Sequence, residues 1–164
     1  MTKNIKLTCI LTAVIIIVLD QITKLFFIDL LSNPTDPTEI IQVTSFFNFV
    51  MVWNTGVSFG LFADNADLGR WILTIVALCI VTGLWFWLMR VQNKYIAIAI
   101  GFIIGGALGN VIDRIRLGAV ADFLDFHVNT YHWPAFNLAD SMIFIGVIIL
   151  LFEELIINIG AKDE

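Results

Sequence analysis

The sequence predicts a mainly helical membrane protein with four transmembrane helices. Of its 164 residues, 59% are hydrophobic and only 14% are charged, and the mean hydropathy is +0.92. A soluble domain averages roughly 45–50% apolar and about 25% charged residues. Four apolar stretches are long enough to span a bilayer. They place the spans at residues 7–30, 71–89, 95–112 and 137–159 of a single integral-membrane domain, residues 1–164.

The charge pattern argues against a nucleic-acid partner. The formal net charge is −5, and no basic stripe could follow a phosphate backbone.

Cys9 and Cys79 both lie in apolar stretches. We expect them to be small buried side chains rather than a disulfide or a metal pair. No Cys/His spacing typical of a metal site occurs, and no obligate protein partner is inferred.

The first span contains a lysine and an aspartate. No small-residue cleavage site follows its apolar stretch, so we interpret it as a retained helix rather than a removable signal. Asp20 and Lys24 are four residues apart, so they lie on one helix face and can pair. The pair either neutralises itself near the membrane surface or braces a polar site, and the sequence leaves both interpretations open.

The segment after the first span contains a predicted strand. Residues 32–37 are rich in proline, asparagine and aspartate, as turns are. Val43–Trp53 alternates with a period of two, which is typical of a strand. A turn with two glycines, Asn54–Gly60, follows, and the polar segment Ala63–Arg70 could form a short surface helix or cap.

The second and third spans, 71–89 and 95–112, are uncharged. The third is rich in glycine, and small residues let helices approach closely in lipid. We therefore favour a packing role over a direct chemical role for Gly101, Gly105, Gly106 and Gly109.

A second strand is predicted over Gly118–Val128. Its alternation puts Asp122 on an otherwise apolar face, where a carboxylate needs a partner or a proton. Asp125 and His127 fall on the opposite face, where we expect them to be solvated.

The fourth span starts after Pro134 with a capping signal. Asn137 is a good N-cap, and Asp140 stands three residues later, as in a capping box with aspartate in place of glutamate. Capping alone could explain Asp140. Glu153 and Glu154 would lie at the far interface.

Lysine and arginine positions predict the orientation, since cytoplasmic segments carry more of them. The parity of four spans supports the same arrangement. Both termini should face the cytoplasm, and the aspartate-bearing loops should face outward. The five predicted cytoplasmic residues are Lys3, Lys6, Arg90, Lys94 and Lys162, against Arg70, Arg114 and Arg116 outside.

Carboxyl groups are the catalytic candidates. His127 and His132 have no nucleophile placed by a motif beside them. Two aspartates that share a site hold one proton between them, so one can activate water while the other donates to a carbonyl oxygen. We select Asp122 and Asp140. The helix N-terminus favours the charged form of Asp140, whereas the apolar strand face favours the neutral form of Asp122.

Five motifs in this order resemble those of the lipoprotein signal peptidase family (signal peptidase II), bacterial membrane aspartyl proteases. They cover nearly the whole chain and read Asp20-Gln21-x-Thr23-Lys24, Asn54-x-Gly56-x-Ser58-Phe59-Gly60, Gly109-Asn110-x-x-Asp113-Arg114, Val120-x-Asp122-Phe123 and Phe136-Asn137-x-Ala139-Asp140. The family often has alanine where this chain has Ser58.

The resemblance implies a site and a fold. It assigns the catalytic pair to Asp122 and Asp140, and supporting or substrate-binding positions to Asp20, Lys24, Asn54, Gly56, Asn110, Asp113, Arg114, Asn137 and Ala139. It implies four transmembrane helices, a small extracytoplasmic β-cradle and a short extracytoplasmic lid helix, to which Ala63–Arg70 would correspond.

The resemblance also implies a reaction. The enzyme would sit in the bacterial cytoplasmic (inner) membrane and act near its extracytoplasmic face. It would cut diacylglyceryl-modified prolipoproteins just before the lipidated cysteine, without a metal or organic cofactor. Membrane lipid would surround the enzyme, and globomycin-type cyclic peptides would inhibit it.

Two other functions are considered. Presenilin-type proteases use Tyr-Asp and Gly-x-Gly-Asp motifs, and neither occurs in this sequence. A small transporter or assembly factor would use the aspartates as a proton relay. That function predicts carboxyl groups deep within the spans, whereas Asp122 and Asp140 are expected at their outer ends.

Overall fold

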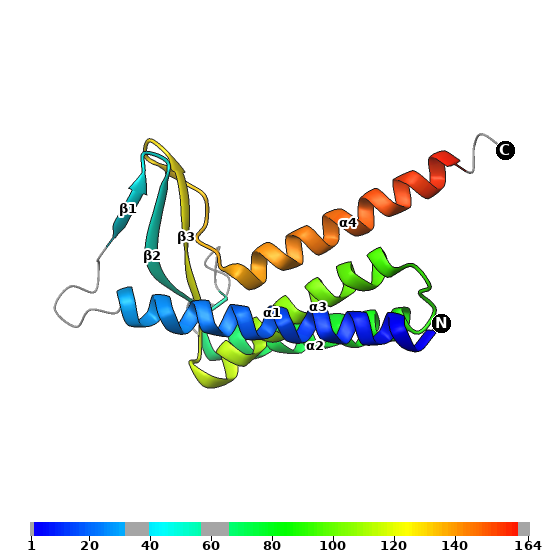
Figure 1. The fold of residues 1–164 in the computed structure, drawn as a ribbon. Helices are drawn as coiled ribbons and strands as arrows, with labels where there is room; N and C mark the ends of the chain where they lie inside the picture. The colour runs from blue at the N-terminus through cyan, green and yellow to red at the C-terminus, as the bar shows by residue number, and fades with distance from the viewer. Residues whose placement is uncertain (1, 32–39, 57–65, 161–164) are drawn as a thin grey trace.

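The computed structural model describes residues 2–31, 40–56 and 66–160. Within these residues the chain forms four helices, with an antiparallel four-stranded sheet at one end of them (Figure 1). The elements in chain order are α1 (Thr2–Leu31), β1 (Ile41–Thr44), β2 (Phe47–Asn54), α2 (Ala66–Leu88), α3 (Lys94–Arg116), β3 (Val120–Val128), β4 (Tyr131–His132) and α4 (Leu138–Gly160).

In the described part of the chain, three helices are long and apolar enough to cross a membrane. They are Asn4–Leu31, Asp67–Leu88 and Lys94–Arg116. At about 1.5 Å per residue, each is comparable in length to, or longer than, a hydrocarbon core of about 30 Å. The fourth predicted span forms α4. That α4 also crosses the membrane stays a prediction.

Helix α3 lies at the centre and packs against α1, α2 and α4. Its glycines allow this close packing. A Cβ atom on Gly101 would lie 2.8 Å from the Cys9 carbonyl oxygen, and one on Gly105 would lie 2.8 Å from the Ala13 carbonyl oxygen. The predicted packing role of the glycines is therefore confirmed.

The sheet has the order β1-β2-β3-β4. A single strand over Val43–Trp53 was the wrong prediction, because the chain reverses at residues 45–46 and forms a hairpin. The Phe46 N–H donates to the Thr44 hydroxyl oxygen (3.3 Å) within this turn. The strand predicted over Gly118–Val128 is confirmed as β3, with β4 following as a short return strand.

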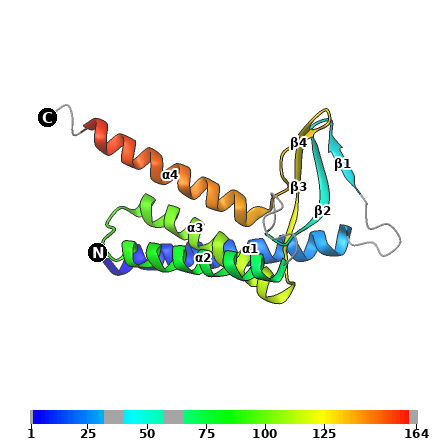
Figure 2. The same ribbon diagram turned by 180° about the vertical axis from the view of Figure 1, so that it is seen from behind.

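Aromatic stacking joins the sheet to α1. The Phe27 ring lies 4.2 Å from the Phe123 ring and 4.6 Å from the Phe49 ring, measured between centroids. Figure 2 shows the sheet standing across one end of the helices, while the start of α1 and the end of α4 lie at the other end. α4 therefore starts beside the sheet and runs away from it.

Two local predictions are corrected. Residues 66–70 form the first turns of α2 rather than a separate surface helix. The rest of the predicted lid, and the turn from residue 57 onward, lie outside the described residues. Cys9 is buried as expected, but Cys79 is exposed because its side of α2 faces outward from the helices.

Candidate active site

Asp122 lies in β3 with a side chain that is almost fully buried. Its Oδ2 atom accepts a hydrogen bond from Asn54 Nδ2 (2.9 Å), and its Oδ1 atom accepts one from Asn137 Nδ2 (2.6 Å). Burial raises the pKa of Asp122 to about 6, the Asn54 hydrogen bond opposes the shift, and the charge of Asp140 adds to it. The direction agrees with the expectation that Asp122 favours its neutral form.

Asp140 lies in the first turn of α4 and helps to cap it. Its Oδ2 atom accepts from the Asn137 backbone N–H (3.2 Å), while its own N–H donates to Asn137 Oδ1 (3.0 Å). This reciprocal pair confirms the predicted capping box. Asp140 Oδ1 also accepts from Asn110 Nδ2 (2.7 Å). Capping therefore uses only part of this carboxyl group.

Two buried asparagines connect the aspartates. Asn137 Nδ2 donates both to Asp122 and to Asn110 Oδ1 (3.2 Å), and Asn110 in turn donates to Asp140. The strand aspartate and the helix aspartate thus belong to one hydrogen-bond network, although they are 18 positions apart in the sequence.

A buried ion cluster lies on the other side of Asn110. Lys24 Nζ lies 2.9 Å from Asp20 Oδ2, 2.7 Å from Asp113 Oδ2 and 2.9 Å from Asn110 Oδ1. Asp20 Oδ1 accepts from the backbone N–H of Ala139 at the start of α4 (3.0 Å). Two interpretations were left open for the Asp20–Lys24 pair. The structure favours the one in which the pair supports a polar site, because it contacts Asn110 and the start of α4.

Asp113 and Arg114 point into different surroundings. Asp113 faces α1, pairs with Lys24 and accepts from the Ala121 backbone N–H (3.4 Å). Arg114 Nη1 donates to the backbone carbonyl oxygen of Asn110 (3.4 Å). The buried Nε atom of Arg114 has no hydrogen-bond partner in the described part of the chain. Arg114 is close enough to Asp140 and Asp122 to interact with them electrostatically.

Gly56 orients Asn54. The Gly56 N–H donates to Asn54 Oδ1 (2.8 Å), which leaves Asn54 Nδ2 to face Asp122. Gly56 has a φ of 91°, a conformation that side chains other than glycine rarely adopt. The glycine is therefore required by the turn that aims Asn54.

Gln21 also belongs to the ion cluster, although the sequence patterns predicted no role for it. Gln21 Nε2 donates to Asp113 Oδ1 (2.9 Å) and to Asp20 Oδ2 (3.2 Å), and its Oε1 accepts from Arg116 Nη1 (3.1 Å). An amide beside an aspartate within an apolar helix was the signal that could have identified it.

The expectation of solvated Asp125 and His127 was wrong. The β2–β3 register places Asp125 opposite Asn48, and Asp125 is only 5% exposed. Burial would raise the pKa of Asp125, but hydrogen bonds from His132 and Asn48 outweigh it and lower the pKa. Both ring nitrogens of His127 are shielded from solvent and have no hydrogen-bond partner among the described residues, and the ring stacks on His132 with 4.9 Å between centroids.

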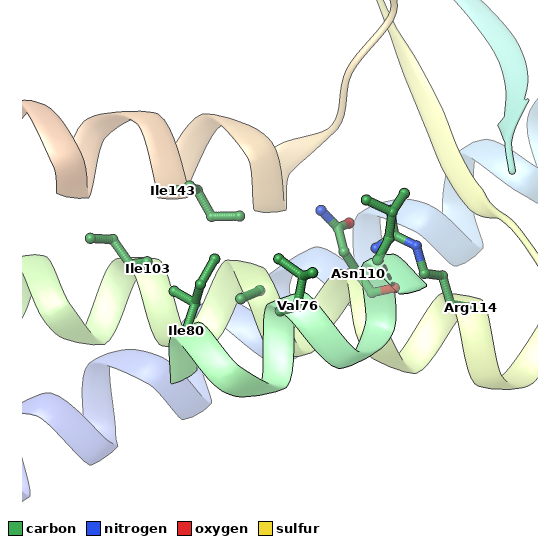
Figure 3. Close-up of a pocket in the computed structure, with 9 residues that line it drawn as sticks. Val76, Ile80, Ile103, Asn110, Arg114 and Ile143 are labelled. Atoms are coloured by element: carbon green, nitrogen blue, oxygen red, sulfur yellow. Dashed lines mark hydrogen bonds between the residues drawn. The ribbon is translucent and has the colours of Figure 1, made fainter. Parts of the chain in front are cut away.

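Cavities lined by described residues reach the network from three sides. One of about 280 Å³ contains Asp122 and Asn54, and a mostly apolar one of about 410 Å³ contains Asp140. A third, of about 210 Å³, lies between α2, α3 and α4. In Figure 3, Asn110 and Arg114 stand at one end of it, and the aliphatic side chains of Val76, Ile80, Ile103 and Ile143 line the rest. Polar groups that can act on a peptide bond thus adjoin apolar space.

Comparisons with known proteins agree on one family. A family model described as signal peptidase (SPase) II matches residues 12–156. A lipoprotein signal peptidase of Rhodopseudomonas palustris (strain TIE-1) is 44% identical over 151 residues, 90% of this chain and 91% of the relative. A lipoprotein signal peptidase of Aeromonas hydrophila subsp. hydrophila is 46% identical over 143 residues, 86% of this chain and 84% of the relative.

Solved structures agree with the fold. A bacterial membrane enzyme structure at 2.3 Å resolution has a TM-score of 0.74 and 31% sequence identity, over 90% of this chain and 87% of that one. A second, at 1.9 Å resolution, has a TM-score of 0.75 and 30% identity, over 90% of this chain and 92% of that one.

Proposed function

Because the chain belongs to the signal peptidase II family, we propose that it removes signal peptides from prolipoproteins, with Asp122 and Asp140 as catalytic residues. One observation carries the assignment of the pair. Asn137 donates to both carboxyl groups, through its side-chain NH₂ group to Asp122 and through its backbone N–H to Asp140, yet the surroundings of the two groups differ. When two carboxyl groups of one site have different surroundings, one can act as the acid and the other as the base.

The proposed mechanism uses Asp140 as the base and Asp122 as the acid. Asp140 takes a proton from a water molecule as its oxygen adds to the scissile carbonyl carbon, while Asp122 protonates the carbonyl oxygen. When the tetrahedral intermediate collapses, the carbon–nitrogen bond breaks and Asp140 returns its proton to the leaving nitrogen. Asp122 recovers a proton from the hydroxyl that becomes the new carboxyl group, so the pair is restored.

The supporting side chains have matching tasks. Asn54 and Asn137 hold Asp122, while Asn110 holds Asp140. Arg114 lies near both carboxyl groups and has a buried Nε–H available, so it can steady the substrate backbone or the developing oxyanion. Asp20, Lys24, Asp113 and Ala139 fix the two helices that carry these groups.

The proposed substrate is a prolipoprotein with a diacylglyceryl group, cut just before the lipidated cysteine. Its two apolar parts, the signal peptide and the acyl chains, need apolar space on either side of the scissile bond. The cavities beside Asn110 and beside Asp140 supply that space. We expect globomycin-type peptides to compete for it, and we place the site at the extracytoplasmic face of the bacterial inner membrane.

Cleavage of a diacylglyceryl-modified prolipoprotein by the purified protein in detergent tests this function. Asp122→Asn and Asp140→Asn should each lower kcat by at least about 10²-fold, because each removes a proton-transfer group. Asp113→Asn should retain measurable activity, because Asp113 faces α1. Wild-type turnover by Asp122→Asn would show that the pair is misassigned. Proton flux in liposomes without cleavage would favour a transporter.

A further inference from the structure

We propose that Lys24 is a positioning residue for the carboxyl pair: it fixes the Asn110 side-chain amide so that the NH₂ group donates to Asp140. The inference deepens the proposed function and rests on it. Lys24 acts through Asn110, since its ammonium contacts Asn110 and two aspartates outside the proposed pair.

The ammonium group of Lys24 has three N–H donors and no acceptor. Its three partners are Asp20 Oδ2, Asp113 Oδ2 and Asn110 Oδ1, all within 2.9 Å. Every donor is therefore used inside the protein, as a lysine that is 1% exposed requires. The third donor defines which atom of the Asn110 amide faces α1.

An asparagine amide can adopt two orientations, and its neighbours select one. If the Asn110 amide were reversed, its NH₂ group would meet the Lys24 ammonium and the NH₂ group of Asn137, donor against donor. The side-chain oxygen of Asn110, Oδ1, must therefore face Lys24. Its NH₂ group then remains for Asp140 Oδ1, at 2.7 Å.

A second obligatory donor fixes Asn137 in the same way. The backbone N–H of Asp140 donates to Asn137 Oδ1, so the Asn137 NH₂ group faces Asn110 Oδ1 and Asp122 Oδ1. Both amides thus present donors to the carboxyl pair. A carboxylate can only accept hydrogen bonds, so donors aimed at Asp140 suit the carboxylate that the proposed base requires.

The surrounding charges explain why this site contains a lysine. Asp20 and Asp113 are both buried and share one ammonium group. Gln21 donates to both carboxylates and so supplies donors where a second cation is missing. A neutral residue at position 24 would leave Asp20 and Asp113 without the ammonium group that both contact, and Asn110 without its orienting donor.

Two isosteric neutral variants separate the donor from the charge. Lys24→Met and Lys24→Gln have similar length and both lack the positive charge, but only glutamine offers an N–H to Asn110. We measure kcat/KM against pH for diacylglyceryl-prolipoprotein cleavage, with folding checked by thermal unfolding. Lys24→Met should move the acidic limb of the profile upward by about one to two pH units, because the carboxyl pair loses an oriented hydrogen-bond donor. Lys24→Gln should recover at least half of that shift.

A double-mutant cycle of Lys24 and Asn110 tests whether Lys24 acts through Asn110. In an Asn110→Ala background, Lys24→Met should move the acidic limb no further, and an additional full shift would overturn the proposal. Equal shifts in Lys24→Met and Lys24→Gln would overturn it as well, because charge alone would then explain them. The neighbouring Thr23→Val is the matched control and should keep the wild-type limb, since its hydroxyl donates to the Asp20 carbonyl oxygen of its own helix.

Asn110→Asp keeps the proposal testable if Lys24→Met does not fold. It preserves an acceptor for Lys24 but removes the donor to Asp140, so it should show the same upward shift, and an unshifted limb would overturn the proposal. Asp140→Asn distinguishes the two levels of failure. If it turns over like wild type, the proposed function fails. If it is inactive while the Lys24 variants remain unshifted, only the positioning role fails.

Discussion

At the scale of single residues, opposing effects of burial and hydrogen bonding set the pKa of Asp122. Burial of the carboxyl group raises its pKa to about 6, and the hydrogen bond from Asn54 limits that rise. An acid that must be protonated to act loses activity as pH rises through its pKa. If Asp122 is the acid, as we propose, the basic limb of kcat/KM should report on it, with an apparent pKa of about 6 in the free enzyme.

Removal of the Asn54 donor should move that limb in a defined direction. Asn54→Ala removes a hydrogen bond that stabilises the charged form of Asp122, so the pKa of Asp122 should rise and the basic limb should shift to higher pH. The pH dependence of kcat/KM checks the shift. A limb that moves to lower pH would contradict the assignment of the protonated acid to Asp122.

At the scale of elements, the contact between α3 and α4 places Asp140 beside Asn110. A Cβ atom on Gly106 would collide with the Ala139 carbonyl oxygen and lie 2.8 Å from Ile143 Cγ1. Since Ala139 directly precedes Asp140, any side chain at position 106 must push the start of α4 away from α3. The close helix contact is thus part of the site.

Gly106→Ala should therefore lower kcat/KM by at least about tenfold, while circular dichroism still shows folded helices. Gly83→Ala in α2 is the matched control, because an added Cβ would meet no described atom within 4 Å. It should retain activity and gain about 0.5–1 kcal/mol of stability from the helix propensity of alanine. Equal losses in both variants would show that the α3–α4 contact does not position the site.

The sheet contains a second hydrogen-bonded cluster, formed by Asn48, Asp125 and His132. It joins β2, β3 and β4. Asp125→Ala leaves the Asn48 amide without its partner, so we expect a loss of about 1–3 kcal/mol of stability. The measurement is thermal unfolding, alongside kcat for the folded fraction. A kcat loss as large as that of Asp122→Asn would indicate that Asp125 takes part in the chemistry.

At the scale of the whole molecule, the sheet and the described chain ends lie at opposite ends of the helices (Figures 1 and 2). The start of α4 and Asp122 both lie at the sheet end. This arrangement fits the predicted orientation, in which both termini are cytoplasmic and the site faces outward.

Cysteine labelling can test the orientation in spheroplasts. In a Cys9→Ala, Cys79→Ala background, Tyr131→Cys at the sheet should react with a membrane-impermeant maleimide, because Tyr131 is 83% exposed. Gln92→Cys, also exposed but between α2 and α3, should react only after the membrane is opened. The reverse pattern would place the sheet in the cytoplasm.

Local sequence patterns were enough to predict the helices, the strand that carries Asp122 and the capping box at Asp140. These features are local, because apolar length, alternation and residues three apart act within one segment. The strand over Val43–Trp53 failed, since alternation alone does not show the reversal after Thr44.

Which polar groups lie together depends on tertiary packing and does not follow from these local patterns. The burial of Asp125 follows from the pairing of β2 with β3, and the role of Gln21 follows from the approach of α1 to α3. The orientation of the Asn110 amide requires Lys24 from another helix. Hydrogen bonds and ion pairs are short-ranged and directional, so their partners depend on how distant segments pack rather than on their spacing along the chain.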